Sequence, residues 1–250
     1  MYFIRYQPFN LSKIAFGQLR IVMTWVWLIN LLASPAAYAA RPMVTDDASI
    51  VDPKACQLES WVQKNRNSTE YWALPACNPT GNLELTLGGA LTHSDIGIRA
   101  TDIVLQGKTL FKPLETNSWG IGLAAGTVYH PTIKAGEHND WYAYIPASFS
   151  FWNDRFVLHL NFGWLREQKI RHHRLTWGTG SETQLAERTW LIAETFGQNQ
   201  GNPFYQMGLR HWIVPERVQL DATYGNRIDN GTQEQWFSIG LRLLSTPFLP

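Results

Sequence analysis

The sequence predicts an all-β protein, an antiparallel up-and-down β-barrel that crosses a membrane with its strands. Three observations predict this class. Segments between residues 82 and 244 alternate apolar and polar side chains with a period of two, as strands do. Turn-rich stretches separate them, and no stretch after the N-terminal region is apolar enough for a membrane helix. The chain also has twelve tryptophans, a residue that gathers where a membrane meets water.

A secreted soluble barrel or sandwich would show the same period, with its apolar face turned inward. Two features favour the membrane. The second face of the strands is rich in Gly, Ser, Thr and charged residues, which suits a hydrated or hydrogen-bonded interior. The apolar face carries aromatic residues near the strand ends, as the girdles of outer-membrane barrels do.

The chain opens with the pattern of a signal peptide, residues 1–39. An apolar run, residues 21–32, is too short to span a bilayer as a helix, and Ala37 and Ala39 are small residues suited to cleavage. The basic residues before or at the edge of this run are Arg5, Lys13 and Arg20. We expect cleavage after Ala39, export across the inner membrane and insertion into the cell outer membrane. An uncleaved anchor is the alternative.

Residues 40–54 are polar, contain two prolines and show no periodicity. They are interpreted as an irregular periplasmic lead-in, or as a segment that tucks into the mouth of the barrel. The barrel itself is predicted over residues 55–250.

Residues 55–77 predict a hairpin stapled by a disulfide. The stretches 55–63 and 69–77 read as strands, and a fold at Arg66 and Asn67 puts Cys56 opposite Cys77. Two cysteines in an exported chain most simply form one disulfide, and their spacing is not that of a metal or redox site. The hairpin raises the strand count from ten to twelve. Twelve is preferred, because an unpaired hairpin would leave exposed edges, and ten stays as the alternative.

The other ten strands follow one another along the chain. Residues 156–165 show the pattern well, since Phe156 and Leu158 alternate with His159 and Asn161 on the opposite face. The least regular segment is 174–182. The ten predicted segments are 82–90, 101–111, 118–128, 140–151, 156–165, 174–182, 188–196, 203–213, 217–225 and 234–244.

The connections predict the orientation of the barrel. Outer-membrane barrels have short periplasmic turns and longer external loops. Residues 78–81, 152–155 and 214–216 form short connections, which places both termini in the periplasm. The connections predicted to be long and external are 91–100, 129–139, 167–173 and 226–233.

Several charged residues fall on the inward face. Asp221 is expected between Arg210 and Arg242 on neighbouring strands, and Arg242 is expected near Glu84 or Glu59. The full predicted lumen cluster is Glu84, Lys108, Glu194, Arg210, Asp221 and Arg242. A cluster of mixed sign is interpreted as an internal salt-bridge network, or as a polar constriction that filters solutes.

Catalysis, metals and cofactors are not indicated. The formal charge is +1, and removing residues 1–39 removes three basic residues, leaving −2, so no nucleic-acid partner is expected. The chain has no G-x-S-x-G and no H-E-x-x-H motif. Ser148 and His159 share the inward face, where they are poorly placed to attack membrane lipid. No catalytic residue, metal ligand or cofactor is predicted, and a lipid-modifying enzyme is the remaining alternative.

The expected partners are outer-membrane lipid, lipopolysaccharide and the barrel-assembly machinery. Lys169, Arg171 and Arg174 lie in a predicted external loop, where basic side chains pair well with lipopolysaccharide phosphates, unless the run is simply solvated. Barrels usually end on an aromatic residue that serves assembly. Here the chain continues past Leu244, so Phe248 or the last strand itself is expected to supply that signal.

The segments RTWLIAETFG, FYQMGLRHWI, RVQLDATYGN and WFSIGLRLL resemble the end of the outer-membrane barrel family named for the meta-pathway of phenol degradation. The N-terminal runs ARPMVTDDASIVDPKACQLESWV and TEYWALPACNPTGNLELTLGGA resemble proteobacterial outer-membrane proteins. The resemblance implies a transporter-like or passive channel for small solutes, aromatic ones among them. The alternative is a structural or surface-interaction barrel whose lumen is plugged.

Overall fold

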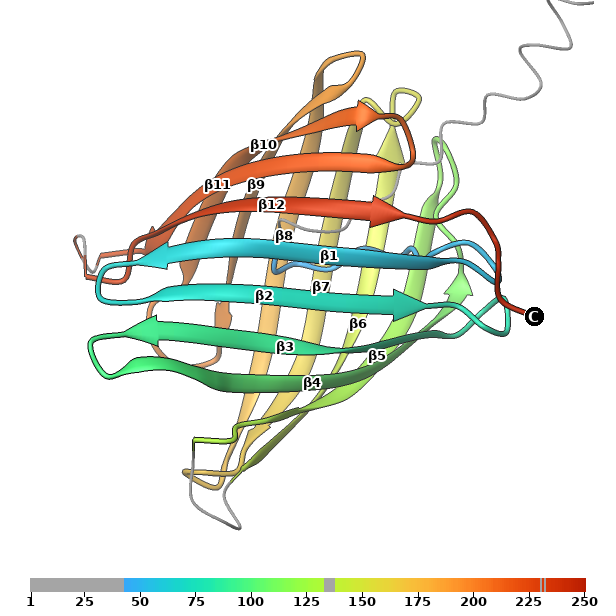
Figure 1. The fold of residues 1–250 in the computed structure, drawn as a ribbon. Coiled ribbons are helices and arrows are strands. Elements are labelled where there is room, and N and C mark those ends of the chain that lie inside the picture. Colours follow the sequence, from blue (N-terminus) through green and yellow to red (C-terminus); the bar gives the residue numbers. More distant parts are fainter. Residues whose placement is uncertain (1–42, 133–137, 230, 232) are drawn as a thin grey trace, which may run out of the picture. The chain divides into compact units, whose positions relative to one another are not determined.

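The structure is a computed structural model that describes residues 43–132, 138–229, 231 and 233–250. The predicted signal peptide therefore lies outside the described residues. Twelve strands close into one antiparallel barrel, drawn in Figure 1. The strands are β1 Cys56–Asn65, β2 Thr69–Cys77, β3 Glu84–Ser94, β4 Gly97–Lys112, β5 Trp119–Tyr129, β6 Asn139–Phe151, β7 Phe156–Glu167, β8 His172–Ala186, β9 Thr189–Gln198, β10 Phe204–Val214, β11 Val218–Arg227 and β12 Trp236–Leu244.

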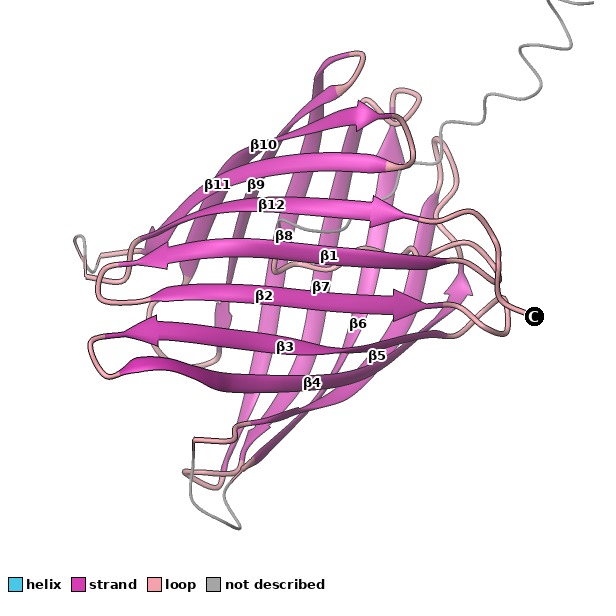
Figure 2. Ribbon diagram, viewed as in Figure 1, coloured by secondary structure: helices cyan, strands magenta, loops and turns pink. Residues whose placement is uncertain are grey.

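Each strand pairs with its neighbours in sequence, and β1 pairs with β12 to close the barrel, so the described part of the chain forms one continuous wall of strands (Figure 2). The β1–β2 hairpin completes this wall between β12 and β3. The prediction of twelve strands is confirmed and the ten-strand alternative is wrong. A closed barrel satisfies its backbone hydrogen bonds internally, which is what the interior of a membrane demands. No helix among the described residues is long and apolar enough to cross a membrane.

The outer surface of the barrel is apolar. Leu87, Leu105 and Phe162, for example, are exposed on three different strands. Exposed aromatic residues lie at both ends of this belt. At the end that holds the C-terminus they include Phe111, Trp119, Phe151 and Trp152, and at the other end Tyr71, Tyr129, Trp141, Trp164 and Tyr224. Two aromatic girdles around an apolar band are typical of a barrel that sits in the outer membrane.

Two of the four loops predicted to be long and external are shorter than predicted. Residues 91–100 were expected to form a long loop, but β3 and β4 continue to a tight turn at residues 95–96, where Gly97 has φ +100°. Likewise β7 and β8 extend so that only residues 168–171 connect them. These strand ends rise past the apolar belt, where both faces meet water, so they lose the alternating pattern while keeping their ladder hydrogen bonds. The two longest connections, 130–138 and 228–235, do lie at the end opposite the C-terminus.

Candidate functional site

The candidate site is the lumen. In each strand every second side chain points inward and lines it. It is polar. All six residues of the predicted lumen cluster are buried, each with at most 6% of its surface exposed. Buried polar residues missed by the prediction include Asp47, Glu182, Gln206 and Gln219. Ser148 and His159 were expected on the inward face, and both are fully buried there.

A segment of the chain itself fills part of this lumen. Residues 43–51, here called the plug, run from the start of β1 into the barrel (Figure 1). Of the two interpretations of residues 40–54, this arrangement agrees with a segment that tucks into the barrel, and not with a lead-in that stays outside it. Two carboxylates of the wall accept hydrogen bonds from the plug backbone. Glu194 accepts from the amides of Val44 (2.9 Å) and Thr45 (2.8 Å), and Glu84 accepts from the amide of Val51 (2.9 Å).

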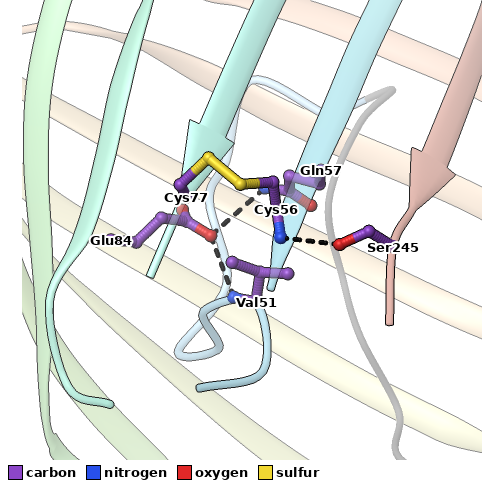
Figure 3. Close-up of a disulfide and its surroundings, with 6 residues drawn as sticks. All are labelled: Val51, Cys56, Gln57, Cys77, Glu84 and Ser245. Carbon is purple, nitrogen blue, oxygen red and sulfur yellow. Dashed lines mark hydrogen bonds between the residues drawn. A yellow bond between two sulfur atoms is a disulfide. The ribbon is translucent and has the colours of Figure 1, made fainter. Parts of the chain in front are cut away.

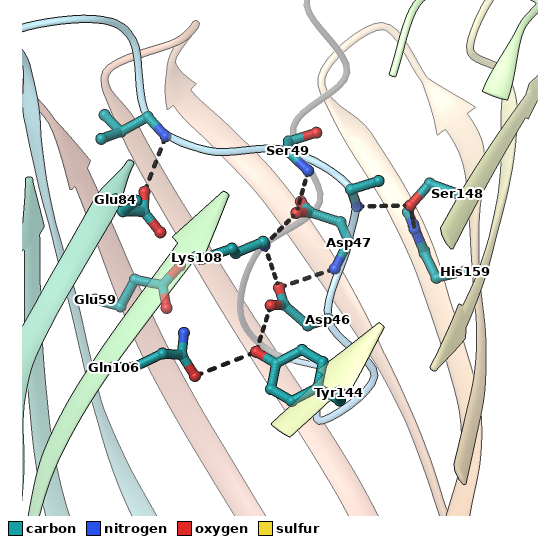
Figure 4. A network of polar contacts seen from close by, with 12 residues as sticks. Asp46, Asp47, Ser49, Glu59, Glu84, Gln106, Lys108, Tyr144, Ser148 and His159 are labelled. Carbon is teal, nitrogen blue, oxygen red and sulfur yellow. Dashed lines mark hydrogen bonds and ion pairs between the residues drawn. The ribbon is translucent and has the colours of Figure 1, made fainter. Parts of the chain in front are cut away.

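Asp46 and Asp47 bind the plug to Lys108 of β4. Figure 4 shows the ammonium group between the two carboxylates, 2.8 Å from Asp46 and 3.0 Å from Asp47. The second oxygen of Asp46 accepts a hydrogen bond from the hydroxyl of Tyr144 (2.6 Å). Burial raises the pKa of Asp47 above its ordinary value, and the charge of Lys108 opposes this shift. The plug is therefore held by polar contacts with the wall and not by apolar packing alone.

A second anchor combines a serine and a histidine. The Ser148 hydroxyl accepts a hydrogen bond from the amide of Ala48 (2.8 Å) and lies 2.8 Å from Nδ1 of His159, its register partner on β7. His159 Nε2 lies 3.4 Å from Glu182, which forms an ion pair with Arg210. In a catalytic triad Nε2 faces the serine and Nδ1 faces the acid, which is the reverse of this arrangement. Ser148 and His159 are also fully buried beneath the plug.

The remaining lumen charges lie near β1 and β11. Arg242 lies 3.6 Å from Glu59, its register partner on β1, and donates to the side chain of Gln57 (2.6 and 2.9 Å). Asp221 is the register partner of Arg210, as predicted, and Arg210 also forms an ion pair across β9 with Glu182. The predicted residues therefore share one lumen. Arg242 has its predicted neighbour Glu59, whereas the pairing of Arg210 with Glu182 was not predicted.

The segment between the plug and β1 is held at the end of the barrel that carries the C-terminus. The disulfide and the hydrogen bonds that hold it there, at Cys56 and Lys54, are here called the collar. The predicted disulfide between Cys56 and Cys77 is confirmed, and its cysteines are register partners at the ends of β1 and β2 (Figure 3). The amide of Cys56 donates to Ser245 Oγ (2.9 Å), after β12. The Lys54 carbonyl accepts hydrogen bonds from the amides of Phe248 (2.9 Å) and Leu249 (3.0 Å). Phe248 therefore contacts this segment through its backbone, while its side chain is 64% exposed.

Beside and beyond the plug the lumen contains a cavity of about 810 Å³. The cavity extends from plug residues such as Asp46 to the turns at the end opposite the C-terminus, where Arg66 and Gln233 line it. Its aromatic lining residues are Trp61, Trp72, Tyr144, Phe196, Phe204 and Trp236. Trp61 and Trp72 stack with ring centres 5.0 Å apart, and the indole of Trp236 donates to Gln206 (2.9 Å). Flat apolar faces and amide groups thus share one cavity.

The predicted basic loop lies at the same end as the mouth of this cavity. Lys169 and Arg171 are exposed at the β7–β8 turn. Arg174 is only partly exposed, because it lies 3.8 Å from Glu167 and hydrogen-bonds to Gln200. No group of three or more His, Cys, Asp or Glu residues in the described ranges is arranged to hold a metal ion.

These features define a class: a closed twelve-strand barrel of the outer-membrane type, with an apolar belt and a polar, partly filled lumen. The chain belongs to the family described as "Uncharacterised conserved protein UCP029691", whose model matches residues 27–244. A search of curated protein sequences finds no match. Membership of the family named for the meta-pathway of phenol degradation is not shown.

Solved structures share the fold. A KdgM porin has a TM-score of 0.58 at 8% identity, over 75% of this chain and 98% of the porin. A NanC porin has a TM-score of 0.56 at 9% identity, over 77% and 100%. The COG4313 outer membrane channel from Pseudomonas putida F1 has a TM-score of 0.52 at 12% identity, over 83% and 100%. At such identities the likeness establishes the fold alone.

Proposed function

We propose that this chain, exported across the inner membrane, is an outer-membrane channel for small solutes that the plug holds closed. The observation that carries the proposal is the cavity of about 810 Å³, which lies against the plug and reaches the external turns. A barrel whose only task was structural would gain nothing from such a cavity. The plug is also bound largely by hydrogen bonds and ion pairs, which water can replace when it leaves.

Aromatic solutes are the proposed preference. The cavity is lined by the stacked rings of Trp61 and Trp72 and by Phe204 and Trp236, whose ring centres lie 5.9 Å apart. Offset or edge-to-face contacts with such rings favour a flat apolar solute. The resemblance to barrels named for phenol degradation agrees with this preference.

The test compares the conductance of two proteins in planar lipid bilayers. Removing residues 43–50 takes away the contacts to Glu194, Lys108 and Ser148, so the shortened barrel is expected to conduct steadily where the full chain opens only briefly. The matched control is Ser49→Ala. This substitution keeps the backbone amide of residue 49, which donates to Asp47 within the plug (2.9 Å), so the plug contacts stay in place. A shortened barrel that folds, keeps its disulfide and still passes neither ions nor small solutes would refute the channel.

The rival function is a structural or surface-interaction barrel with a permanently plugged lumen. The buried network favours it, since Arg210, Glu182 and His159 form a continuous chain of contacts within the wall. In that case the shortened barrel loses stability without gaining conductance. We propose no catalytic role for Ser148 and His159, because the plug covers both and the histidine ring is turned the wrong way for a triad.

Two partners are proposed on the outer surface. Lys169 and Arg171 are free to approach lipopolysaccharide phosphates at the external end, with Arg174 committed mainly to its neighbours. The barrel-assembly machinery is the proposed partner of the last strand, β12. Phe248 lies beyond that strand, and its backbone belongs to the collar.

A further inference from the structure

We propose that Lys108 and Tyr144 form a binding site for the carboxylate of a small organic solute, and that Asp46 of the plug occupies this site while the lumen is closed. The inference rests on the proposed function in one respect: the solute must enter through the cavity. The preference for a carboxylate is inferred from the contacts of Asp46 alone.

Asp46 is held as a bound carboxylate would be. One oxygen lies 2.8 Å from the Lys108 ammonium, and the other accepts from the Tyr144 hydroxyl at 2.6 Å (Figure 4). Lys108 and Tyr144 come from β4 and β6, and both are register partners of Ala124 on the strand between them. Because alanine is small, it leaves room between the two donors. A charged donor and a hydroxyl aimed at one point suit a carboxylate.

The charges around Lys108 make an exchange feasible. Only 4% of Lys108 is exposed, and a buried ammonium without a counter-charge would be costly. Glu84 is its register partner, but that carboxylate already accepts from Val51 (2.9 Å) and Gln57 (3.3 Å). Asp47 remains as a second acid. Replacing Asp46 by a solute carboxylate leaves the total charge at the site unchanged.

Other charges nearby do not oppose the exchange. Glu59 and Arg242 also line the cavity, and they lie 3.6 Å apart, so their charges largely balance each other. Lys108, which keeps Asp47 as its second carboxylate, can therefore take one incoming anion in place of Asp46.

The cavity gives access to the site and suggests the rest of the solute. Asp46, Lys108 and Tyr144 all line it, and 24% of the Asp46 side chain is exposed. Trp61 and Trp72 line the same cavity. The ligand class is therefore a monocarboxylate with a flat apolar body, and its binding removes one of the contacts that keep the plug in place.

The experiment is calorimetric titration of the full chain in detergent with benzoate, and with benzamide as its uncharged counterpart. Asp46→Ala empties the site, so this variant is expected to bind benzoate roughly tenfold or more tightly than the unmodified chain, in which Asp46 competes. The matched control is Asp95→Ala at the external β3–β4 turn, which should bind as the unmodified chain does. Asp46→Ala combined with Lys108→Met should bind neither compound.

Equal binding of benzoate and benzamide, or no gain in Asp46→Ala over Asp95→Ala, would overturn the proposal. Should Asp46→Ala fail to fold, Ser49→Cys in the otherwise unmodified chain reports on the plug instead. Benzoate, and not benzamide, should speed its reaction with a maleimide, and an unchanged rate would equally refute the site. Titration in detergent needs no conductance, so failure of the channel and failure of the site are distinguishable.

Discussion

Single residues show how a membrane barrel can keep charges inside its wall. Arg210 is 1% exposed and forms an ion pair with Glu182, and Glu194 accepts two backbone amides of the plug. Lys108 lies between two aspartates. Removing one partner of such a pair leaves the other charge buried and uncompensated, which costs far more than the pair contributes.

Arg210→Ala is therefore expected to destabilise the barrel by about 3–5 kcal/mol. The reason is that Glu182 would stay buried beside His159 without its cation. The measurement is the free energy of unfolding in urea, with the protein folded into lipid vesicles. Solute permeability of the folded fraction should stay near that of the unmodified protein, because Arg210 does not line the cavity.

The control for this substitution is Arg166→Ala, which removes an exposed arginine from β7 and should change stability by no more than about 0.5 kcal/mol. If Arg166→Ala and Arg210→Ala lowered the free energy of unfolding by similar amounts, the buried ion pair would contribute no more to stability than an exposed arginine does.

Alternation along the strands was enough to place six charged residues in the lumen and to bring Arg242 near Glu59, but not to find Glu182 beside Arg210 or the partners of Lys108. Arg210 and Glu182 belong to β10 and β8, which are separated by β9, whereas register arguments pair neighbouring strands only. The partners of Lys108 lie in the plug, which has no period from which a contact could be predicted. Long side chains and irregular segments carry such contacts, and neither leaves a signal in the pattern.

Among the elements, the β1–β2 hairpin was the most predictable. Its turn residues and its two cysteines are close in sequence, so local chemistry fixes both the register and the disulfide. The external loops were less predictable, because strand ends such as Ser94 and Gly97 pair in water without an apolar face. The plug takes its shape from the lumen wall, which consists of residues far away in the chain.

Replacing Cys56 and Cys77 together by alanine tests the collar. A typical disulfide stabilises a fold by about 2–4 kcal/mol. Since Cys56 is two residues from Lys54, whose carbonyl is clamped by the C-terminal tail, we expect both lower stability and a looser plug. Faster hydrogen exchange of the Val44 and Thr45 amides would report the loosening.

The control for the collar is Ser60→Ala on the same strand, which leaves the disulfide intact and should leave both amides protected. Unchanged exchange in the double alanine variant would mean that the wall contacts alone hold the plug.

The whole molecule combines a membrane wall with an asymmetric interior. The plug, the serine and histidine anchor and the disulfide collar belong to the half of the barrel near the C-terminus, while the cavity reaches the opposite end. In the proposed orientation, a solute from outside would meet the aromatic rings first and the plug afterwards, which agrees with the proposed channel that the plug closes.

The most direct test of the gate is to lock it. A Cβ on Gly178 would lie 3.3 Å from that of Thr45, close to the separation of about 3.5–4.5 Å found in disulfides, so Thr45→Cys with Gly178→Cys should cross-link the plug to β8. The measurement is bilayer conductance before and after reduction, with the chain lacking the two new cysteines treated alike. The account predicts no openings when oxidised and recovery to the level of that control when reduced. Equal conductance in both states would contradict it, because solutes would then pass without moving the plug.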